Sequence, residues 1–241
     1  NLESIGIALQ PRLALPGETQ LRGLLEVPAG HVLTLCDGSI ASTRYWSLES
    51  RPHTEEFDQT ARRVRELLAE AVATQVTHHR TGPVGAMLSG GLDSTSVAAL
   101  SVQALRGIYQ EADLRTYCIH FEEPRSSFAP SAIRPDIDSP YASLAAAHLG
   151  CKHATVYIGS EQIASSLADA RRARDLPGWG QMDASMLTLF REMNQECRVA
   201  VTGEVADELF GGYPQYFDQA LVNRAQFPWL DEGPRLGSYL S

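Results

Sequence analysis

Apolar and polar residues alternate along this chain with two different periods. Over residues 54–79, apolar side chains recur at steps of three and four, which predicts one long amphipathic helix. Four shorter helical patterns follow, and they end near residues 106, 149, 174 and 196. Apolar runs between the helices predict buried strands at 84–88, 114–121, 153–158 and 199–201. Strands that alternate with helices predict an α/β fold with right-handed crossovers and a parallel sheet.

Residues 1–50 show no helical period, and they predict β structure and loop. Two short β-type runs, 32–35 and 40–43, flank the pair Asp37-Gly38, which is a signal for a hairpin turn. A hairpin alone is only marginally stable in water. We therefore expect this hairpin to pack against a larger domain.

Pro, Gly and Ser mark the ends of the later elements. Pro140 is predicted to open the helix that Gly150 stops, and Ser160 is predicted to cap the next helix. Residues 122–139 are rich in Pro and Ser and too long for a simple connection, which predicts a mobile flap over a ligand site. Residues 175–183 predict an irregular stretch that lines a pocket.

Composition narrows the class of protein. The chain is 44% hydrophobic and 20% charged, with no apolar run long enough to cross a membrane and no signal peptide, so we expect a cytoplasmic protein without a membrane partner. Its net charge is −9 and Lys152 is its sole lysine, which argues against a nucleic-acid partner because no basic stripe is present. Its four widely spaced cysteines fit reduced thiols better than disulfides or a zinc site.

The stretch between the first apolar run and the following helix carries the clearest chemistry. A strand, a Gly-rich turn and a helix N-terminus together hold anions, because free backbone N–H groups and the helix dipole point at the same place. Gly90 and Gly91 let the backbone approach a phosphate closely, and three hydroxyl residues add donors: Ser89, Ser94 and Thr95. A carboxylate here would repel a phosphate unless a cation lay between them, so Asp93 implies Mg²⁺. The alternative is an ordinary strand-to-helix turn.

Three carboxylates form a second cluster behind the last strand. Glu204, Asp207 and Glu208 stand at i, i+3 and i+4, so a helix there would bring them to one side near its positive end. Such clustering is unfavourable without a neutralising group, and a metal ion or an acid–base task would account for it. The alternative is a set of ordinary first-turn acids, and spacing alone does not decide between the two.

Both clusters resemble motifs of one family. Residues 89–94 (SGGLDS) resemble the pyrophosphate loop of ATP pyrophosphatases, most closely that of asparagine synthetases, and residues 203–213 (GEVADELFGGY) resemble the second motif of those enzymes. The resemblance implies a five-stranded parallel sheet with helices on both faces, the adenine nucleotide alpha-hydrolase-like fold. It also implies ATP and Mg²⁺ as cofactors, and a carboxylate that is activated as an adenylate while pyrophosphate leaves.

The resemblance also assigns roles by position. Asp93 and Asp207 would hold Mg²⁺ on the pyrophosphate, and Glu204 would act as the acid–base or nucleophile-orienting residue, so these three form the implied catalytic set. The implied nucleotide-binding residues are Met87, Leu88, Ser89, Gly90, Gly91, Asp93, Ser94, Ile119, Met186, Thr202 and Gly203. Val205 replaces a glycine of the motif, so the local backbone shape is an open question.

The resemblance further divides the chain into two parts. Residues 1–53 would be the C-terminal hairpin part of a glutaminase-like β domain, and residues 54–241 an ATP pyrophosphatase domain. None of the four cysteines fits the N-terminal nucleophile of such a glutaminase, so either that domain is missing or ammonia is not the nucleophile. No lysine follows Lys152. Either the family's catalytic lysine lies beyond the 241 residues, which is the alternative we expect, or the second half-reaction is built differently.

Several members of this class compete as the subtype. Residues 133–141, 173–177 and 182–183 look most like lasso-peptide cyclases, which join a peptide's N-terminal amine to an Asp or Glu side chain. That subtype implies a precursor peptide as substrate and a leader-peptide-binding or protease partner. A glutamine-hydrolysing asparagine synthetase, acting on a small carboxylate and an amine, stays open. β-Lactam synthetases fit less well because they carry Tyr where this chain has Glu204. A non-catalytic module that binds nucleotide or peptide is the remaining alternative.

Overall fold

The computed structural model describes residues 17, 19, 21–77, 82–109, 113–122, 128–130, 136–175 and 181–224. Contacts divide the chain into a larger unit, Glu55–Phe217, and a smaller one that includes the described residues before 55 and after 217. Most of the predicted flap (122–139) and of the irregular stretch (175–183) lies outside the described residues. Residues 181–183 are helical, so the expectation of an irregular stretch is wrong for them. The flap stays a prediction, as does the rest of the irregular stretch.

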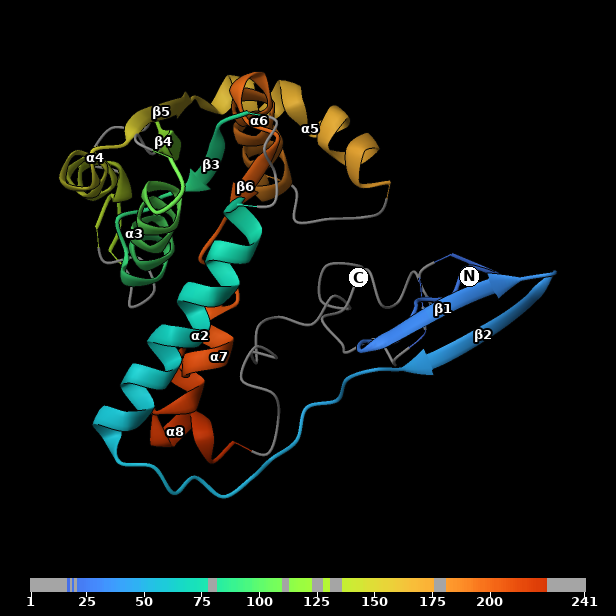
Figure 1. The fold of residues 1–241 in the computed structure, drawn as a ribbon. Coiled ribbons are helices and arrows are strands. Elements are labelled where there is room, and N and C mark those ends of the chain that lie inside the picture. Colours follow the sequence, from blue (N-terminus) through green and yellow to red (C-terminus); the bar gives the residue numbers. More distant parts are fainter. Residues whose placement is uncertain are drawn as a thin grey trace. The chain divides into compact units, whose positions relative to one another are not determined.

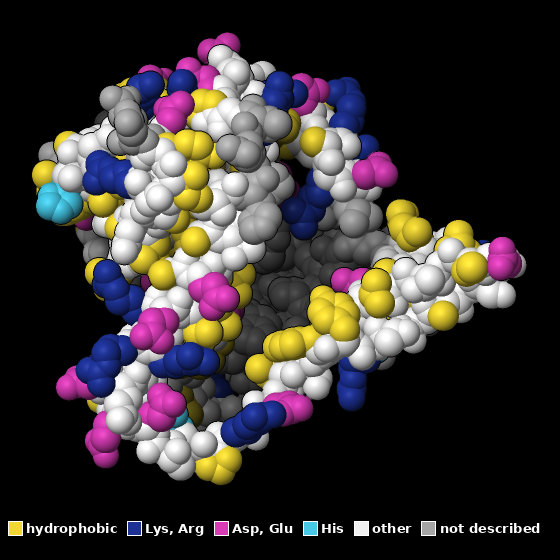
Figure 2. All heavy atoms as spheres, in the orientation of Figure 1, with side chains coloured by type: hydrophobic (Ala, Val, Ile, Leu, Met, Phe, Trp, Pro, Cys, Tyr) yellow, Lys and Arg dark blue, Asp and Glu magenta, His cyan; other side chains and the backbone are white. Residues whose placement is uncertain are grey.

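The smaller unit contains the predicted hairpin. Strands β1 (His31–Cys36) and β2 (Ser39–Arg44) pair antiparallel from His31–Arg44 to Cys36–Ser39. Asp37 (φ 50°) and Gly38 (φ 78°) both adopt the left-handed conformation that a two-residue type I′ turn needs, which confirms the hairpin. Every strand residue except His31 is exposed, and Figure 2 shows apolar side chains along this surface. A short helix, α8 (Gln219–Val222), also belongs to this unit, and the Asp218 carboxylate caps it.

A parallel sheet forms the centre of the larger unit. Its strands run in the order β5-β4-β3-β6 and comprise β3 (Val84–Met87), β4 (Leu114–Phe121), β5 (Lys152–Ile158) and β6 (Val199–Val201). The expected α/β class is confirmed, but the expectation of five strands is wrong for the described residues, which hold four. The last described strand ends at Val201. The residues that follow it, Thr202, Gly203 and Glu204, are not an apolar run that could form a fifth strand.

Helices cover both faces of the sheet (Figure 1). On one face lie α3 (Leu92–Arg106) and α4 (Asp138–Leu149), with α2 (Phe57–Thr77) packed on α3. On the other face, α6 (Gln181–Glu196) contacts β4 and β5, and α5 (Ser160–Arg174) packs on α6. No described helix is both long enough and apolar enough to cross a bilayer.

The helix ends differ from the sequence expectations by a few residues. Helix α4 begins at Asp138, so Pro140 lies inside its first turn, and Gly150 (φ 70°) ends the helix as expected. Helix α6 begins at Gln181, three residues before the expected Ala184. Ser160 is the first residue of α5 rather than its cap, because Gly159 occupies the cap position in an extended conformation.

Alternate residues of β4 build a core on each face of the sheet. Cys118 packs with Ala98 and Ala142, whose small side chains are fully buried and let α3 and α4 come close. Tyr117 faces the opposite way and packs with Leu189 and Met193 of α6. Each such fully buried Leu or Met side chain contributes about 1.5–3 kcal/mol.

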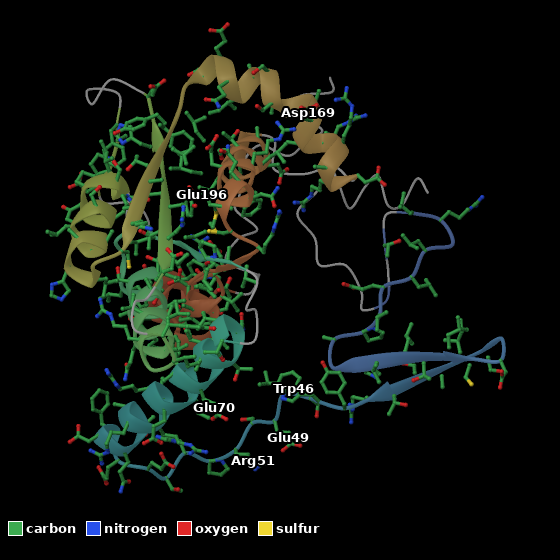
Figure 3. The ribbon with its side chains drawn as sticks, turned by 45° about the horizontal axis from the view of Figure 1, so that its top comes forward. Trp46, Glu49, Arg51, Glu70, Asp169 and Glu196 are labelled. Carbon is green, nitrogen blue, oxygen red and sulfur yellow. The ribbon has the colours of Figure 1, made fainter. Side chains whose placement is uncertain are left out.

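Helix α6 makes polar contacts with β4 and with α5, and Figure 3 labels two of the residues involved, Glu196 and Asp169. The Tyr117 hydroxyl donates to Glu196 Oε2 at 3.2 Å, and Arg115 forms an ion pair with the same carboxylate. Burial raises the pKa of Tyr117, so its hydroxyl stays a donor. Asp169 of α5 binds Arg191 of α6 at 3.1 Å, an exposed ion pair of little energetic weight.

A small polar network joins β4 to β5. His153 Nδ1 lies 3.0 Å from the Thr116 hydroxyl, and its Nε2 lies 3.3 Å from the Thr155 hydroxyl. Burial lowers the pKa of His153 from its ordinary 6.5. The folded protein therefore resists protonation of this ring more than the unfolded chain does.

Acidification is expected to weaken the fold through His153. Above its ordinary pKa of 6.5 the ring is neutral in both states; below it the unfolded chain takes up the proton first, so the free energy of unfolding falls. Urea denaturation between pH 8 and pH 5.5 measures this fall. His153→Gln cannot titrate there, so its curve should be flatter than that of the wild type. Parallel curves would contradict this role.

Candidate functional site

A pocket of about 490 Å³ opens at the carboxyl ends of β3, β4 and β6. Ligands of open parallel sheets bind at this edge. Of the catalytic and nucleotide-binding residues that the resemblance implies, all but Gly90 and Gly91 line the pocket. These residues are Met87, Leu88, Ser89, Asp93, Ser94, Ile119, Met186, Thr202, Gly203, Glu204 and Asp207. The roles that the resemblance assigns to them stay predictions.

The two exceptions, Gly90 and Gly91, determine the backbone conformation of the loop without lining the pocket. Gly90 has φ 84°, and a Cβ on it would lie 2.5 Å from the backbone of Tyr141 in α4, so both conformation and space require glycine. Gly91 is the N-cap of α3 and supplies no capping side chain. The first-turn N–H groups of this 15-residue helix therefore lack a side-chain cap and suit an anion.

Hydrogen bonds of the serine hydroxyl groups join the two ends of the loop at residues 89–94. Ser94 Oγ accepts from the Ser89 backbone N–H at 3.2 Å and lies 2.9 Å from Ser89 Oγ. Ser89 Oγ in turn accepts from the Gly91 N–H at 3.3 Å. Thr95, expected as a third donor, does not line the pocket; its Oγ1 is buried and has no hydrogen-bond partner among the described residues.

The two sequence motifs touch through their backbones. A Cβ on Gly203 would lie 2.7 Å from the Ser94 nitrogen and 2.9 Å from the Asp93 carbonyl carbon. The loop after β6 therefore lies directly on the first turn of α3, although the two are far apart in sequence. This contact places Asp93 and Asp207 in the lining of one pocket.

The carboxylates of Asp93 and Asp207 suit a magnesium ion. Neither takes part in an ion pair within the described parts of the chain. No group of three or more His, Cys, Asp or Glu residues suited to a metal occurs there either. Mg²⁺ is commonly bound by only one or two carboxylates, with phosphate and water oxygens completing its shell. Two carboxylates without an ion-pair partner among the described residues, beside a loop whose N–H groups suit an anion, fit that pattern.

The second motif is not one helix. Asp207 and Glu208 lie in α7 (Ala206–Phe210), but Glu204 precedes it, and its N–H donates to the Thr202 hydroxyl at 3.2 Å. The expectation of three acids on one helical side is therefore wrong for Glu204. The cause is Val205, whose φ of 73° is left-handed and stops the helix from extending backward.

Val205 keeps a glycine-like backbone without a glycine. A β-branched residue in the left-handed region is a genuine outlier, costing about 1–3 kcal/mol. The left-handed conformation of Val205 is thus held at the expense of strain.

Val205→Gly is expected to stabilise the protein by about 1 kcal/mol. Relief of strain exceeds the extra entropy of glycine in the unfolded chain, about 0.4–1 kcal/mol. The Val205 side chain is more than half exposed, so its removal loses little burial. Urea unfolding at neutral pH measures the change, and a less stable variant would contradict the strain.

Several lining residues were not predicted. They are Tyr117, Cys118, Phe121, Asp138, Ser185, Leu189, Val205 and Tyr213. Met182 lies in the stretch 175–183 that was expected to line a pocket, and it does so. Helical spacing could have predicted Leu189, because Met182, Met186 and Leu189 are separated by steps of four and three and so share one side of α6. Tyr213 belongs to the quoted second motif and carried no assigned role.

A second hollow, about 410 Å³, lies beside α6 and β6 and has no carboxylate in its lining. Its walls are mostly apolar, with Phe190, Met193 and Val199 among them, and its charged groups are Arg191 and Arg198. It therefore offers no site for a cation.

Comparison with known proteins places the chain in a family. The family model described as asparagine synthase matches residues 63–241. The chain belongs to the asparagine synthase family. It is 36% identical over 218 residues to "Asparagine synthetase [glutamine-hydrolyzing] 3" of Bacillus subtilis, covering 89% of this chain and 34% of that protein.

Other relatives show the same partial coverage. A putative glutamine-hydrolysing asparagine synthetase of Mycobacterium tuberculosis is 31% identical, over 83% of this chain and 28% of that protein. The chain thus spans about a third of the length of the curated relatives it matches. Among solved structures, it is similar to a glutamine-dependent NAD⁺ synthetase from Acinetobacter baumannii in complex with ADP, at 19% identity and a TM-score of 0.42, covering 69% of this chain and 29% of that one.

Proposed function

We propose that this asparagine synthase-family chain is the adenylating part of an ATP-dependent amide synthetase. It would activate a carboxylate as an acyl-adenylate with release of pyrophosphate and then pass the acyl group to an amine. One observation carries this proposal: the backbone contact of Gly203 with Asp93 and Ser94, which unites an anion loop and two carboxylates in one pocket.

Each side of the pocket has a task in the first half-reaction. The Ser89 and Ser94 hydroxyls and the N-terminal amides of α3 bind the β- and γ-phosphates. Asp93 and Asp207 would hold Mg²⁺, which neutralises the charge that develops on the leaving pyrophosphate. The apolar side chains of Met87, Ile119 and Met186 provide a wall for the adenine ring, and Thr202 and Gly203 contact the rest of the nucleotide.

Glu204 serves the second half-reaction. It lines the pocket outside α7, and the hydrogen bond from its N–H to Thr202 fixes the turn that carries it. A carboxylate there can accept a proton from the attacking amine and orient it towards the acyl group.

For the subtype we propose a lasso-peptide macrolactam cyclase, with a precursor peptide as substrate and a leader-peptide-binding or protease partner. Support comes from the sequence at 133–141, 173–177 and 182–183. The names of the relatives favour a glutamine-hydrolysing asparagine synthetase as the second candidate. A binding module without catalysis is the third.

Product analysis separates the candidates. The protein is incubated with ATP, Mg²⁺ and either its cognate precursor peptide or aspartate with glutamine or ammonia. The cyclase proposal predicts a peptide lighter by one water, with AMP and pyrophosphate formed in equal amounts. Asparagine with an unchanged peptide would overturn the subtype. An absence of ATP–pyrophosphate exchange with every carboxylate would leave the binding module.

A further inference from the structure

The chain folds back onto Asp207 as soon as α7 ends. Gly211 is the C-cap and has φ 70°, a left-handed conformation that reverses the chain. The Gly212 N–H then donates to the Asp207 carbonyl oxygen at 2.9 Å. The backbone at Gly212 therefore lies beside the residue that we assign to the metal.

The Asp207 carboxylate fills the space where a side chain at residue 212 would begin. A Cβ on Gly212 would overlap Asp207 Oδ1 and lie 3.0 Å from its Cγ. Gly212 is not among the described residues with a positive φ, in contrast to its neighbour Gly211. Its backbone conformation thus admits any residue, and glycine is required by the space that Asp207 takes, chiefly its carboxylate and less severely its Cα at 3.3 Å.

Tyr213 stabilises this reversal of the chain through a hydrogen bond to α7. Tyr213 lines the pocket, and its hydroxyl donates to Glu208 Oε1 at 3.4 Å. One turn of helix and the three residues after it thus form a closed unit. Within this unit the Asp207 carboxylate rests against bare backbone on one side and borders the pocket on the other.

We propose that Gly212 is a positioning residue for the Asp207 carboxylate, a role that rests on the proposed function. With glycine at 212, the carboxylate can lie along the backbone in the rotamer that shares a cation with Asp93. Any Cβ there forces the carboxylate to rotate away and leaves Asp93 to bind the ion alone. Gly212 itself is not among the residues that line the pocket.

Gly212→Ala tests this role through metal binding without turnover. Mn²⁺ is titrated by electron paramagnetic resonance into the protein with a non-hydrolysable ATP analogue. The half-saturating Mn²⁺ concentration is expected to rise at least about tenfold, the effect of losing about 1.4 kcal/mol. Gly107→Ala is the matched control, because that Cβ meets nothing nearer than the Ala104 carbonyl oxygen at 3.4 Å and should bind Mn²⁺ as the wild type does.

If Gly212→Ala is too unstable for the Mn²⁺ titration, a double-mutant cycle measured by thermal unfolding tests the same role. The added Cβ should lower the unfolding midpoint more when Asp207 is present than in an Asp207→Ala background, because there the overlapping carboxylate is gone and only the Cα of residue 207, at 3.3 Å, remains close. Wild-type Mn²⁺ affinity in Gly212→Ala, or an equal loss of midpoint in both backgrounds, would overturn the positioning role alone. A wild-type protein that binds no Mn²⁺ with the nucleotide would overturn the proposed function as well.

Discussion

Replacing Asp93 with asparagine is expected to slow ATP–pyrophosphate exchange by about three orders of magnitude, and Asp207→Asn should do the same. A metal ion that neutralises the leaving pyrophosphate is worth several kcal/mol of transition-state stabilisation, and each 1.36 kcal/mol is a factor of about ten in rate. Asparagine keeps the shape of each side chain but removes the charge that holds the ion. Exchange of labelled pyrophosphate into ATP, at saturating substrate and Mg²⁺, measures the loss.

The double variant distinguishes a shared ion from two separate effects. If both carboxylates hold one ion, Asp93→Asn combined with Asp207→Asn should be scarcely slower than either single variant, because the ion is already lost. Asp58→Asn in the first turn of α2 is the control and should exchange at the wild-type rate. Multiplied losses in the double variant would contradict the shared site.

Replacing Glu204 with glutamine is expected to separate the two half-reactions. Amide formation should slow by about 10²–10⁴-fold, the usual contribution of a positioned general base. Pyrophosphate exchange should change little, because the glutamine backbone still donates to the Thr202 hydroxyl and the phosphate loop is untouched. Exchange and amide formation are measured on the same preparation by label transfer and mass spectrometry.

If glutamine slowed exchange and amide formation equally, Glu204 would act on the nucleotide, and the assignment to the second half-reaction would be wrong.

Local pattern was enough to predict most of the secondary structure. The apolar steps from Phe57 and the Asp37-Gly38 turn depend on neighbours in sequence, and both elements formed as predicted. Helix starts were less certain, because Gly159 caps α5 with backbone alone and α6 begins three residues early. The count of strands in a sheet cannot be inferred from sequence motifs. Five strands were expected, and the described sheet has four.

The site was predictable where its residues belong to motifs and not where it depends on long-range contacts. Ser89, Asp93 and Asp207 were identified from short stretches and line one pocket. The close approach of Gly203 to Ser94, and of Gly90 to Tyr141, joins segments that no local pattern relates. The left-handed backbone of Val205 was also hidden, because valine disfavours that conformation and only the surrounding chain imposes it.

A crystal structure with Mn²⁺ and a non-hydrolysable ATP analogue would locate the metal by its anomalous signal. The proposed mechanism predicts an ion bound by carboxylate oxygens of both Asp93 and Asp207, at about the 2.1 Å typical of such octahedral sites. Its remaining ligands would include the β- or γ-phosphate, seated on the N–H groups of residues 89–94. A metal bound by only one of these aspartates, or phosphates lying away from that loop, would contradict it.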